Sequence, residues 1–306
     1  MEAPTATAPK LGALVRPPDR AWIGILCMAG AIFIFSMASV LTKWLTESYS
    51  VPQAMFFRCL VALVPVMVVA AWEGRVQVWR TQRLSGHLLR ASFGLIAMAL
   101  LFTSLSLLPI ADVTAITFAG PIFATALSVP LLGEKVGVRR WTAILIGFAG
   151  VLFMVRPGAD GFRLAMIVAV CTPIFYGLVA TTLRQLTATE ENLTIVFYYM
   201  TIGATVTGLI LPFGWWKTPD VTDLMLFLTL GLIGGIGQFL MTHGYRNAPV
   251  AVLSPFEYTA IIWTSLAGFF IWDEVMTIWT IVGGSLVIAS GLYILHRETV
   301  LRRQRA

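Results

Sequence analysis

Charged residues are scarce in this 306-residue chain, at 12% of the total, whereas hydrophobic residues make up 58%. A soluble domain carries roughly twice that share of charged residues. Histidine is rarer still, with three dispersed residues, and the glycine motifs of nucleotide and dinucleotide sites do not occur. These absences argue against a nucleotide-driven pump, common cofactor chemistry and a zinc site. We therefore expect no cofactor, no metal site and no catalytic residues.

Cysteine is also sparse. The three cysteines, Cys27, Cys59 and Cys171, lie far apart along the chain. Their odd number and wide spacing fit neither a disulfide framework nor a metal-ligand motif. All three fall inside the long apolar segments, where we expect them to act as small packing residues.

Long uncharged runs recur along the chain, and each is about as long as the 20 or so helical residues needed to cross a bilayer. Three further segments carry one ionisable residue each, and one shorter segment is extended backwards through two arginines. The sequence therefore predicts an all-α polytopic membrane protein with ten transmembrane helices. The six uncharged runs are 22–41, 91–111, 113–132, 164–183, 193–216 and 275–295; the other four segments are 54–72, 138–155, 224–245 and 247–272.

Basic residues are distributed unevenly between the predicted loops. Of the 21 lysines and arginines, Arg58 lies within a span, and only Lys43, Arg156, Arg163 and Lys217 fall on one side of the membrane. The remaining sixteen fall on the side of both chain ends. The positive-inside rule then places both termini in the cytoplasm, with the protein in the cytoplasmic (inner) membrane of a bacterium. Such a distribution fits contact with membrane lipid and does not indicate nucleic-acid binding.

The two halves of the chain align with each other at an offset of 140 residues without a gap. "LLGE" at 131–134 then coincides with "IWDE" at 271–274. Each half has five predicted helices, an odd number, so the halves must have opposite orientations in the membrane. Inverted repeats of this kind are typical of secondary transporters. We divide the chain into a disordered tail (1–20), two five-helix repeats (21–158 and 159–298) and a basic tail (299–306).

Three stretches carry a resemblance to a known family: "FFRCLVAL" in the second span, "PIADVTAITFAGPIFATALSVPLLGE" and "PVAVLSPFEYTAIIWTSLAGFFIWDE". Together with the repeat they resemble the EamA repeats of the drug/metabolite transporter superfamily, and the ten-helix plan is similar to that of bacterial amino-acid exporters of the YddG type. The resemblance implies a central cavity lined by helices one, three, four, six, eight and nine. It also implies that helices five and ten pack away from the cavity.

Polar and aromatic residues share faces of the predicted cavity helices. Gly231, Gly234, Gly235, Gln238 and Thr242 form one such face, for which close helix packing explains the glycines about as well as a cavity does. Hydroxyl groups in membrane helices more often bond to their own backbone than to a ligand. We take as candidate substrate-binding residues Ser36, Ser39, Phe102, Thr117, Phe118, Phe175, Tyr176, Gln238, Thr242, Glu257 and Tyr258.

Glu257 is a carboxylate within a predicted span, where an unpaired charge costs several kcal/mol. We expect it to reach the same depth as His243, across the hairpin between helices eight and nine. It is either a site for a substrate ammonium group or proton, or a structural partner of His243. Arg58 either binds a substrate carboxylate or contacts the outer loops, and the second reading is favoured. Glu134 and Glu274 are expected to make helix-end or loop contacts.

Small residues line the fifth and tenth predicted helices: Ala143, Gly147 and Gly150 in one, Ser285 and Ala289 in the other. They predict close-packing surfaces, either within a monomer or between the two protomers of a dimer.

The cavity candidates are mostly aromatic or hydroxyl-bearing, with few charges. This favours a small-molecule substrate that is neutral or amphipathic. We expect a secondary transporter working by alternating access, and specifically an exporter of amino acids, including aromatic and other apolar ones. The alternative within the same class is an uptake carrier for a nucleoside-like or vitamin-like solute. A membrane-embedded enzyme or a channel is the alternative from another class. The chain, however, lacks the clustered acidic or histidine residues that such an enzyme needs and the filter-like loop of a channel.

Overall fold

The computed structural model describes residues 21–74, 77–132, 138–156, 164–186, 189–247, 253 and 256–305. The expected tail at 1–20 and the predicted contact of Glu134 lie outside these residues. Within the described part the chain forms helices and turns and no strands.

The first half contains six helical segments: α1 (Ala21–Thr46), α2 (Val51–Trp72), α3 (Leu84–Leu107), α4 (Ile110–Thr117), α5 (Gly120–Leu132) and α6 (Val138–Val155). The second half contains α7 (Leu164–Leu186), α8 (Asn192–Ile210) with the 3₁₀ turn η2 (Leu211–Phe213), α9 (Val221–Asn247), α11 (Ala260–Trp272) and α12 (Ile278–Arg305). The start of α12 lies well before the predicted basic tail, and the helix continues through most of it.

Helices dominate because a bilayer offers no water to backbone groups, so each spanning segment must satisfy its own N–H and C=O groups. Seven stretches of the described chain are long and apolar enough to cross a membrane, with α4 and α5 counted as one, and α6, α11 and α12 supply three shorter apolar helices. Together they correspond to the ten predicted spans. The fold prediction is confirmed.

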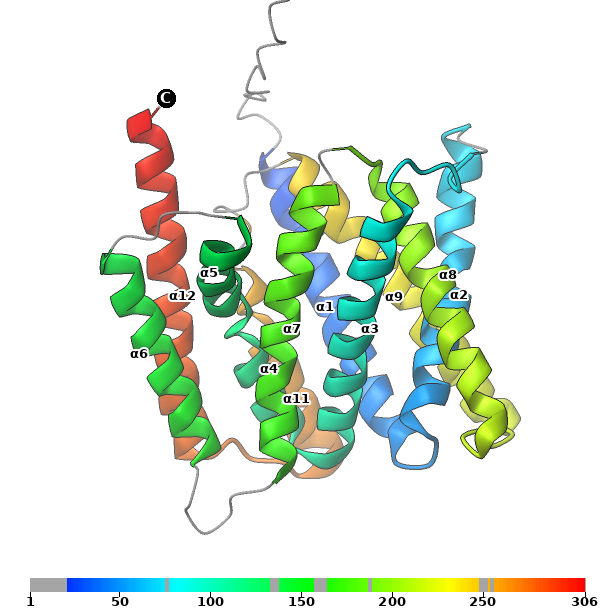
Figure 1. Cartoon of the computed structure of the whole chain (residues 1–306). Coiled ribbons are helices and arrows are strands. Elements are labelled where there is room, and N and C mark those ends of the chain that lie inside the picture. Colours follow the sequence, from blue (N-terminus) through cyan, green and yellow to red (C-terminus); the bar gives the residue numbers. More distant parts are fainter. Residues whose placement is uncertain are drawn as a thin grey trace, which may run out of the picture.

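The packing of the helices follows the internal repeat. α1 packs along α9, and the equivalent pair in the repeat, α7 and α3, packs in the same way. Two further contacts, α2 with α8 and α6 with α12, each join a helix to its own repeat equivalent. In Figure 1, α6 and α12 stand at one side of the bundle and α2 and α8 at the other. The remaining helices fill the middle, in the arrangement that the resemblance implies.

The α6–α12 pair is held by close backbone approach. A side-chain carbon at Gly150 would lie 2.7 Å from the carbonyl oxygen of Gly283, which leaves no space for it. The hydroxyl of Ser290 donates a hydrogen bond to the Ala143 carbonyl at 2.5 Å. The predicted small-residue face of α6 is therefore correct, and it is used within this chain.

The predicted face of α12 does not pack within this chain. Ser285 and Ala289 are exposed, whereas Gly283, Val287 and Ser290 are buried. The hydroxyl of Ser285 donates to the carbonyl of Ile281 in its own helix. Packing of this face between two protomers stays a prediction.

Two neighbouring glycines of α12 provide a matched test of this packing. A side-chain carbon at Gly283 would meet the Gly150 carbonyl oxygen at 2.6 Å, whereas one at Gly284 would meet only Ala115, at 3.6 Å. We expect Gly283→Ala to lower the Tm of the purified protein in detergent by about 3 °C or more, because overpacking costs about 1–3 kcal/mol. Gly284→Ala should leave the Tm unchanged or raise it slightly, because alanine favours helix. Equal effects of the two substitutions would contradict the packing described.

Candidate functional site

Two helices are interrupted at equivalent positions of the two halves. α4 ends at Thr117 and α5 begins at Gly120, and in the second half a turn at Tyr258 and Thr259 precedes α11. Phe118 and Tyr258 are separated by the 140-residue offset of the repeat. Their rings meet edge to face, with centroids 5.1 Å apart and planes at 86°. The two interruptions therefore face each other across the boundary between the halves.

The backbone changes its hydrogen bonding at both interruptions. The N–H of Ala119 donates to the carbonyl of Ile116 at 3.1 Å, and that of Ile262 to the carbonyl of Thr259 at 3.0 Å, three residues back in each case. Pro121 has no N–H, so the carbonyl four residues before it loses its usual helical donor. Non-helical backbone at membrane depth is tolerated only inside the protein or beside a water-filled cavity. Transporters built from inverted repeats commonly form their sites at such interruptions.

The predicted hydroxyl residues bond to their own helices. Ser36 donates to the carbonyl of Ile32 at 2.8 Å, Ser39 to that of Phe35 at 3.1 Å, and Thr117 to that of Thr114 at 2.7 Å. This is the usual arrangement for hydroxyl groups in membrane helices. Substrate binding by these three residues stays a prediction.

The predicted aromatic residues fall in different surroundings. Phe102 is buried in a cluster of residues from α1, α2, α3, α8 and α9. The ring of Phe175 lies 6.3 Å from that of Phe93. Tyr176 is partly buried and lies beside Gly120, where α5 begins. Phe118, Tyr258 and Tyr176 are therefore the aromatic candidates that the structure places at the interruptions.

The predicted face of α9 serves mainly for packing. Gly231 and Gly235 lie against side chains of α2, with no space for a larger residue at either position. Gln238 is partly buried on the same helix, and the side chain of Thr242 is outside the described part. The glycines therefore fit the packing interpretation, while a binding role for Gln238 stays a prediction.

Glu257 is partly buried and lies directly before the second interruption. His243 is exposed, and its ring stacks on that of Phe239 with centroids 6.1 Å apart. Pairing of His243 with Glu257 stays a prediction. The structure adds that the helix breaks directly after Glu257, at the turn of Tyr258 and Thr259.

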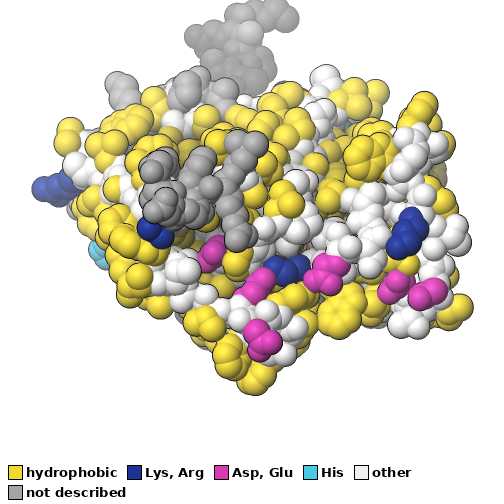
Figure 2. All heavy atoms as spheres, turned by 90° about the horizontal axis from the view of Figure 1, so that it is seen from below, with side chains coloured by type: hydrophobic (Ala, Val, Ile, Leu, Met, Phe, Trp, Pro, Cys, Tyr) yellow, Lys and Arg dark blue, Asp and Glu magenta, His cyan; other side chains and the backbone are white. Residues whose placement is uncertain are grey.

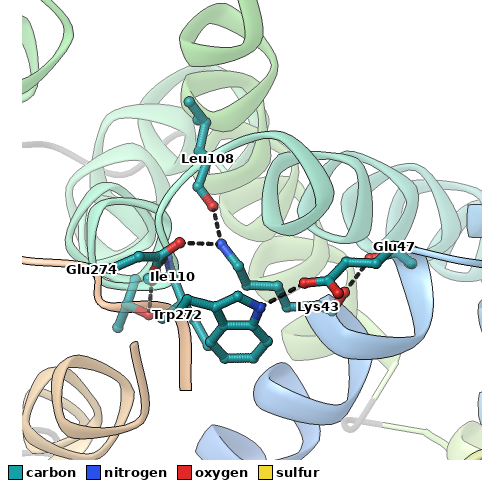
Figure 3. Close-up of polar contacts among 8 residues, drawn as sticks. Lys43, Glu47, Leu108, Ile110, Trp272 and Glu274 are labelled. Carbon is teal, nitrogen blue, oxygen red and sulfur yellow. Dashed lines mark hydrogen bonds and ion pairs between the residues drawn. The ribbon is translucent and has the colours of Figure 1, made fainter. Parts of the chain in front are cut away.

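Acidic and basic side chains cross the lower face of the molecule, the end that carries the α1–α2 turn (Figure 2). In their midst Lys43 is buried, with its Nζ 2.5 Å from Glu274 Oε1. The same Nζ donates to the carbonyl of Leu108 at 2.8 Å, and Glu274 Oε2 accepts from the N–H of Ile110 at 2.9 Å (Figure 3). These bonds join α1, the α3–α4 turn and the α11–α12 loop. The expected helix-end contact of Glu274 is thus present.

An indole completes this group. Trp272 donates from Nε1 to Glu47 Oε1 at 2.5 Å, and the Lys43 ammonium lies 5.3 Å from the centre of its ring system (Figure 3). We call Lys43, Glu47, Trp272 and Glu274 the lower-end latch. It joins α1 of the first half to the end of α11 and the loop after it in the second half.

A second contact between the halves lies on the same face. The Tyr49 hydroxyl donates to Asp223 Oδ2 at 2.6 Å. This hydrogen bond, together with burial and the charge of the same carboxylate, raises the pKa of Tyr49 above its ordinary value. Gln53 and Lys217 exchange side-chain-to-backbone hydrogen bonds at 2.7 and 3.0 Å. The lower end is therefore bonded at two places.

Two arginines occupy the interior in positions that the sequence did not reveal. Arg58 extends against Gly234 in the middle of α9, and not toward the outer loops as favoured above. Arg90, counted above among the loop charges, is buried inside α3, with its guanidinium carbon 4.1 Å from the centre of the Tyr199 ring. The apolar run beginning at residue 91 placed the helix start too late. Arg90 lies one helical turn before Gly94, and this spacing was the sequence feature that could have placed it inside the helix.

The comparisons with known proteins agree with this architecture. The model of the EamA-like transporter family matches residues 22–156 and 163–296, one match in each half. A crystal structure that is 17% identical in sequence, covering 92% of this chain and 99% of its own, superposes with a TM-score of 0.63 and so has the same fold.

Similar proteins include named transporters. A riboflavin transporter of Rhizobium johnstonii is 27% identical over 290 residues, which are 94% of this chain and 95% of that protein. A riboflavin transporter of Vibrio cholerae is 26% identical over 287 residues, with 92% and 95% covered. An S-adenosylmethionine uptake transporter of Rickettsia bellii is 24% identical over 271 residues, with 87% and 92% covered.

The lower-end latch predicts strong coupling between Lys43 and Glu274. We expect Lys43→Met and Glu274→Gln each to lower the Tm in detergent clearly, since either change leaves a largely buried charge without its partner. The double variant should lose much less than the sum of the two, with a coupling energy of about 1–3 kcal/mol in a double-mutant cycle. Lys217→Met removes an exposed ammonium of the same face and should have less than half the effect of Lys43→Met. Additive effects would show that the two residues act independently.

Proposed function

The chain belongs to the EamA-like transporter family, and we propose that it takes up a vitamin-like or nucleoside-like metabolite by alternating access. That it transports a small molecule, and is not an enzyme, follows from the family and from the names of its relatives. The substrate class, the direction and the mechanism are the parts that we propose.

The observation that carries the proposal is the meeting of Phe118 with Tyr258. Two helices break at repeat-equivalent positions, and the breaks touch across the boundary of the halves. A site on this boundary is bordered by equivalent elements of both halves. Rocking of one half against the other can therefore expose it to each side of the membrane in turn.

The lower-end latch supports alternating access because it bonds the halves together at one end. In the proposed cycle, the bonds of Lys43 to Glu274 and of Tyr49 to Asp223 exist while the lower end is closed. Opening of that end separates them. Both bonds involve polar groups that water can solvate once the end opens, so their loss is partly compensated.

The distribution of basic residues supports an orientation with both termini in the cytoplasm. The lower end, with the α1–α2 turn, then faces away from the cytoplasm, and the latch closes the outer side of the protein. Under this orientation the conformation described is closed to the outside.

The relatives favour uptake over the amino-acid export expected from the sequence. Their names specify riboflavin transport and S-adenosylmethionine uptake, and both compounds carry a heteroaromatic ring system. Tyr176 and Tyr258, at or beside the helix breaks, supply aromatic surfaces on which such rings stack well.

Transport by purified protein in liposomes tests this function. We expect labelled riboflavin or S-adenosylmethionine to exchange into proteoliposomes preloaded with the same unlabelled compound, and not into protein-free liposomes. Labelled tryptophan and leucine should not exchange. Exchange of the amino acids without either of the other compounds would instead support the exporter expected from the sequence.

Cysteine labelling tests the orientation. In a background with Cys27, Cys59 and Cys171 replaced by alanine, we expect Lys217→Cys to react with an impermeant maleimide added to intact cells. Gln304→Cys, near the end of α12, should react only after the cells are opened. The reverse pattern would place the latch on the cytoplasmic side and contradict the proposed cycle.

A further inference from the structure

Arg58 and Arg90 are interior cations with unsatisfied hydrogen-bond donors. Nη1 of Arg58, and both Nε and Nη1 of Arg90, are buried and have no hydrogen-bond partner. Arg90 is 9% exposed. In the part of the chain that the structure describes, neither guanidinium forms an ion pair with a carboxylate. A charge held in this way within a membrane is costly, and such residues commonly mark a substrate pathway.

The two guanidinium groups enter the bundle from opposite ends and reach toward its middle. Arg58 lies seven residues into α2 from the lower end, and Arg90 six residues into α3 from the upper end. At about 1.5 Å per residue, the backbone of each arginine lies roughly 10 Å in from the end of its helix. Arg58 extends to Gly234, thirteen residues from either end of α9, and Arg90 extends one turn inward to Gly94. Both side chains therefore point toward the middle of the membrane.

Tyr199 lies on a helix that packs against both arginine-bearing helices. Its helix, α8, contacts α2 and α3, and the guanidinium of Arg90 lies over its ring. Tyr176 comes from α7, which packs along α3. The two arginines and the two tyrosines thus belong to four neighbouring helices.

Glycine leaves space for both cations. A side-chain carbon at Gly234 would collide with the guanidinium of Arg58, and one at Gly94 would collide with both Nη1 of Arg90 and the ring of Tyr199. The Tyr199 ring interacts with the face of the Arg90 guanidinium, whereas the N–H groups lie in the plane of the guanidinium itself. Nε and Nη1 of Arg90 and Nη1 of Arg58 therefore still lack an oxygen acceptor.

We propose that Arg58 and Arg90 bind a carboxylate group of the transported metabolite. A carboxylate is planar, offers two oxygen acceptors to the fork of a guanidinium, and neutralises charge that the protein itself leaves uncompensated. The aromatic rings of Tyr176 and Tyr199 then flank the attached part of the molecule. This inference rests on the proposed transport function, and it makes the substrate more like S-adenosylmethionine, an amino-acid derivative, than like riboflavin, which has no carboxylate.

The first test needs no substrate. Because the two charges lack partners, we expect Arg58→Met and Arg90→Met to keep the Tm of the ligand-free protein unchanged or to raise it by about 2 °C or more. Lys43→Met, which removes a paired cation, should lower it. If both arginine variants lose stability as Lys43→Met does, the arginines are structural and the proposal is wrong. This result is independent of whether any transport assay succeeds.

The second test compares matched ligands by their effect on the Tm. The pairs are nicotinate with nicotinamide, and indole-3-acetate with indole-3-acetamide. We expect the carboxylate of at least one pair, and not its neutral partner, to raise the Tm by about 4 °C near a hundred times its Kd. Arg90→Lys, which keeps the charge but loses the planar fork, should abolish this shift, and so should Arg58→Lys.

The control is Arg83→Met, which removes an exposed arginine just before α3 and should retain the shift. Equal stabilisation by neutral partners, a shift that survives both lysine variants, or no shift with any carboxylate would each overturn the proposal. Failure of the riboflavin and S-adenosylmethionine exchange experiment, with the carboxylate shift intact, would instead reject only the proposed substrates.

Discussion

In the hydrocarbon core of a membrane, backbone and side-chain polar groups need hydrogen-bond partners within the protein, and this constraint accounts for most features of the fold. It requires helices throughout the spans, and it directs serine and threonine hydroxyls to the carbonyls of their own turns. It confines the two helix breaks to the contact between the halves, where Phe118 and Tyr258 cover them. The latch obeys the same rule, since Lys43 is buried only together with Glu274 and the Leu108 carbonyl. Among the buried polar atoms of the described chain that lack a partner, those of Arg58 and Arg90 belong to cations, and they are the basis of the proposed carboxylate site.

The repeat organises the molecule through pairing between the halves. α1 with α9 and α7 with α3 are equivalent contacts, so each half contributes one central helix to a pair completed by the other. The halves are consequently interlocked, and a movement that opens one end must reshape the contacts at the other. The α6–α12 pair has a different character, because the backbones at Gly150 and Gly283 approach too closely for either residue to carry a side chain. Such tight packing favours a rigid support beside the moving centre.

The sequence predicted the fold well because apolar run length and charge are properties of single segments, and these alone identify ten spans. It predicted the site less well, because the site depends on which side of each helix faces its neighbours and on contacts with residues far away in the sequence. Ser285 and Ala289 have the expected size, but the side of α12 that packs on α6 carries Gly283, Val287 and Ser290 instead. Arg90 seemed to belong to a loop, since nothing near it in the chain indicates that Tyr199 will cover it. Pro121 marked the first helix break, whereas no proline occupies the equivalent position, Ile261, in the second half.

The pairing between halves also has a consequence for biogenesis. The partner of Lys43 is made 231 residues later, a delay of about 10–50 s at ordinary rates of translation. α1 remains in the bilayer without α9 until that helix is made, and Lys43 remains without its carboxylate until Glu274 follows. The first half must therefore wait as a loose assembly in the lipid, with surfaces that other helices or quality-control proteases can recognise. Completion of the second half ends this exposure, so the order of synthesis, and not only the final contacts, bears on how much functional protein a cell obtains.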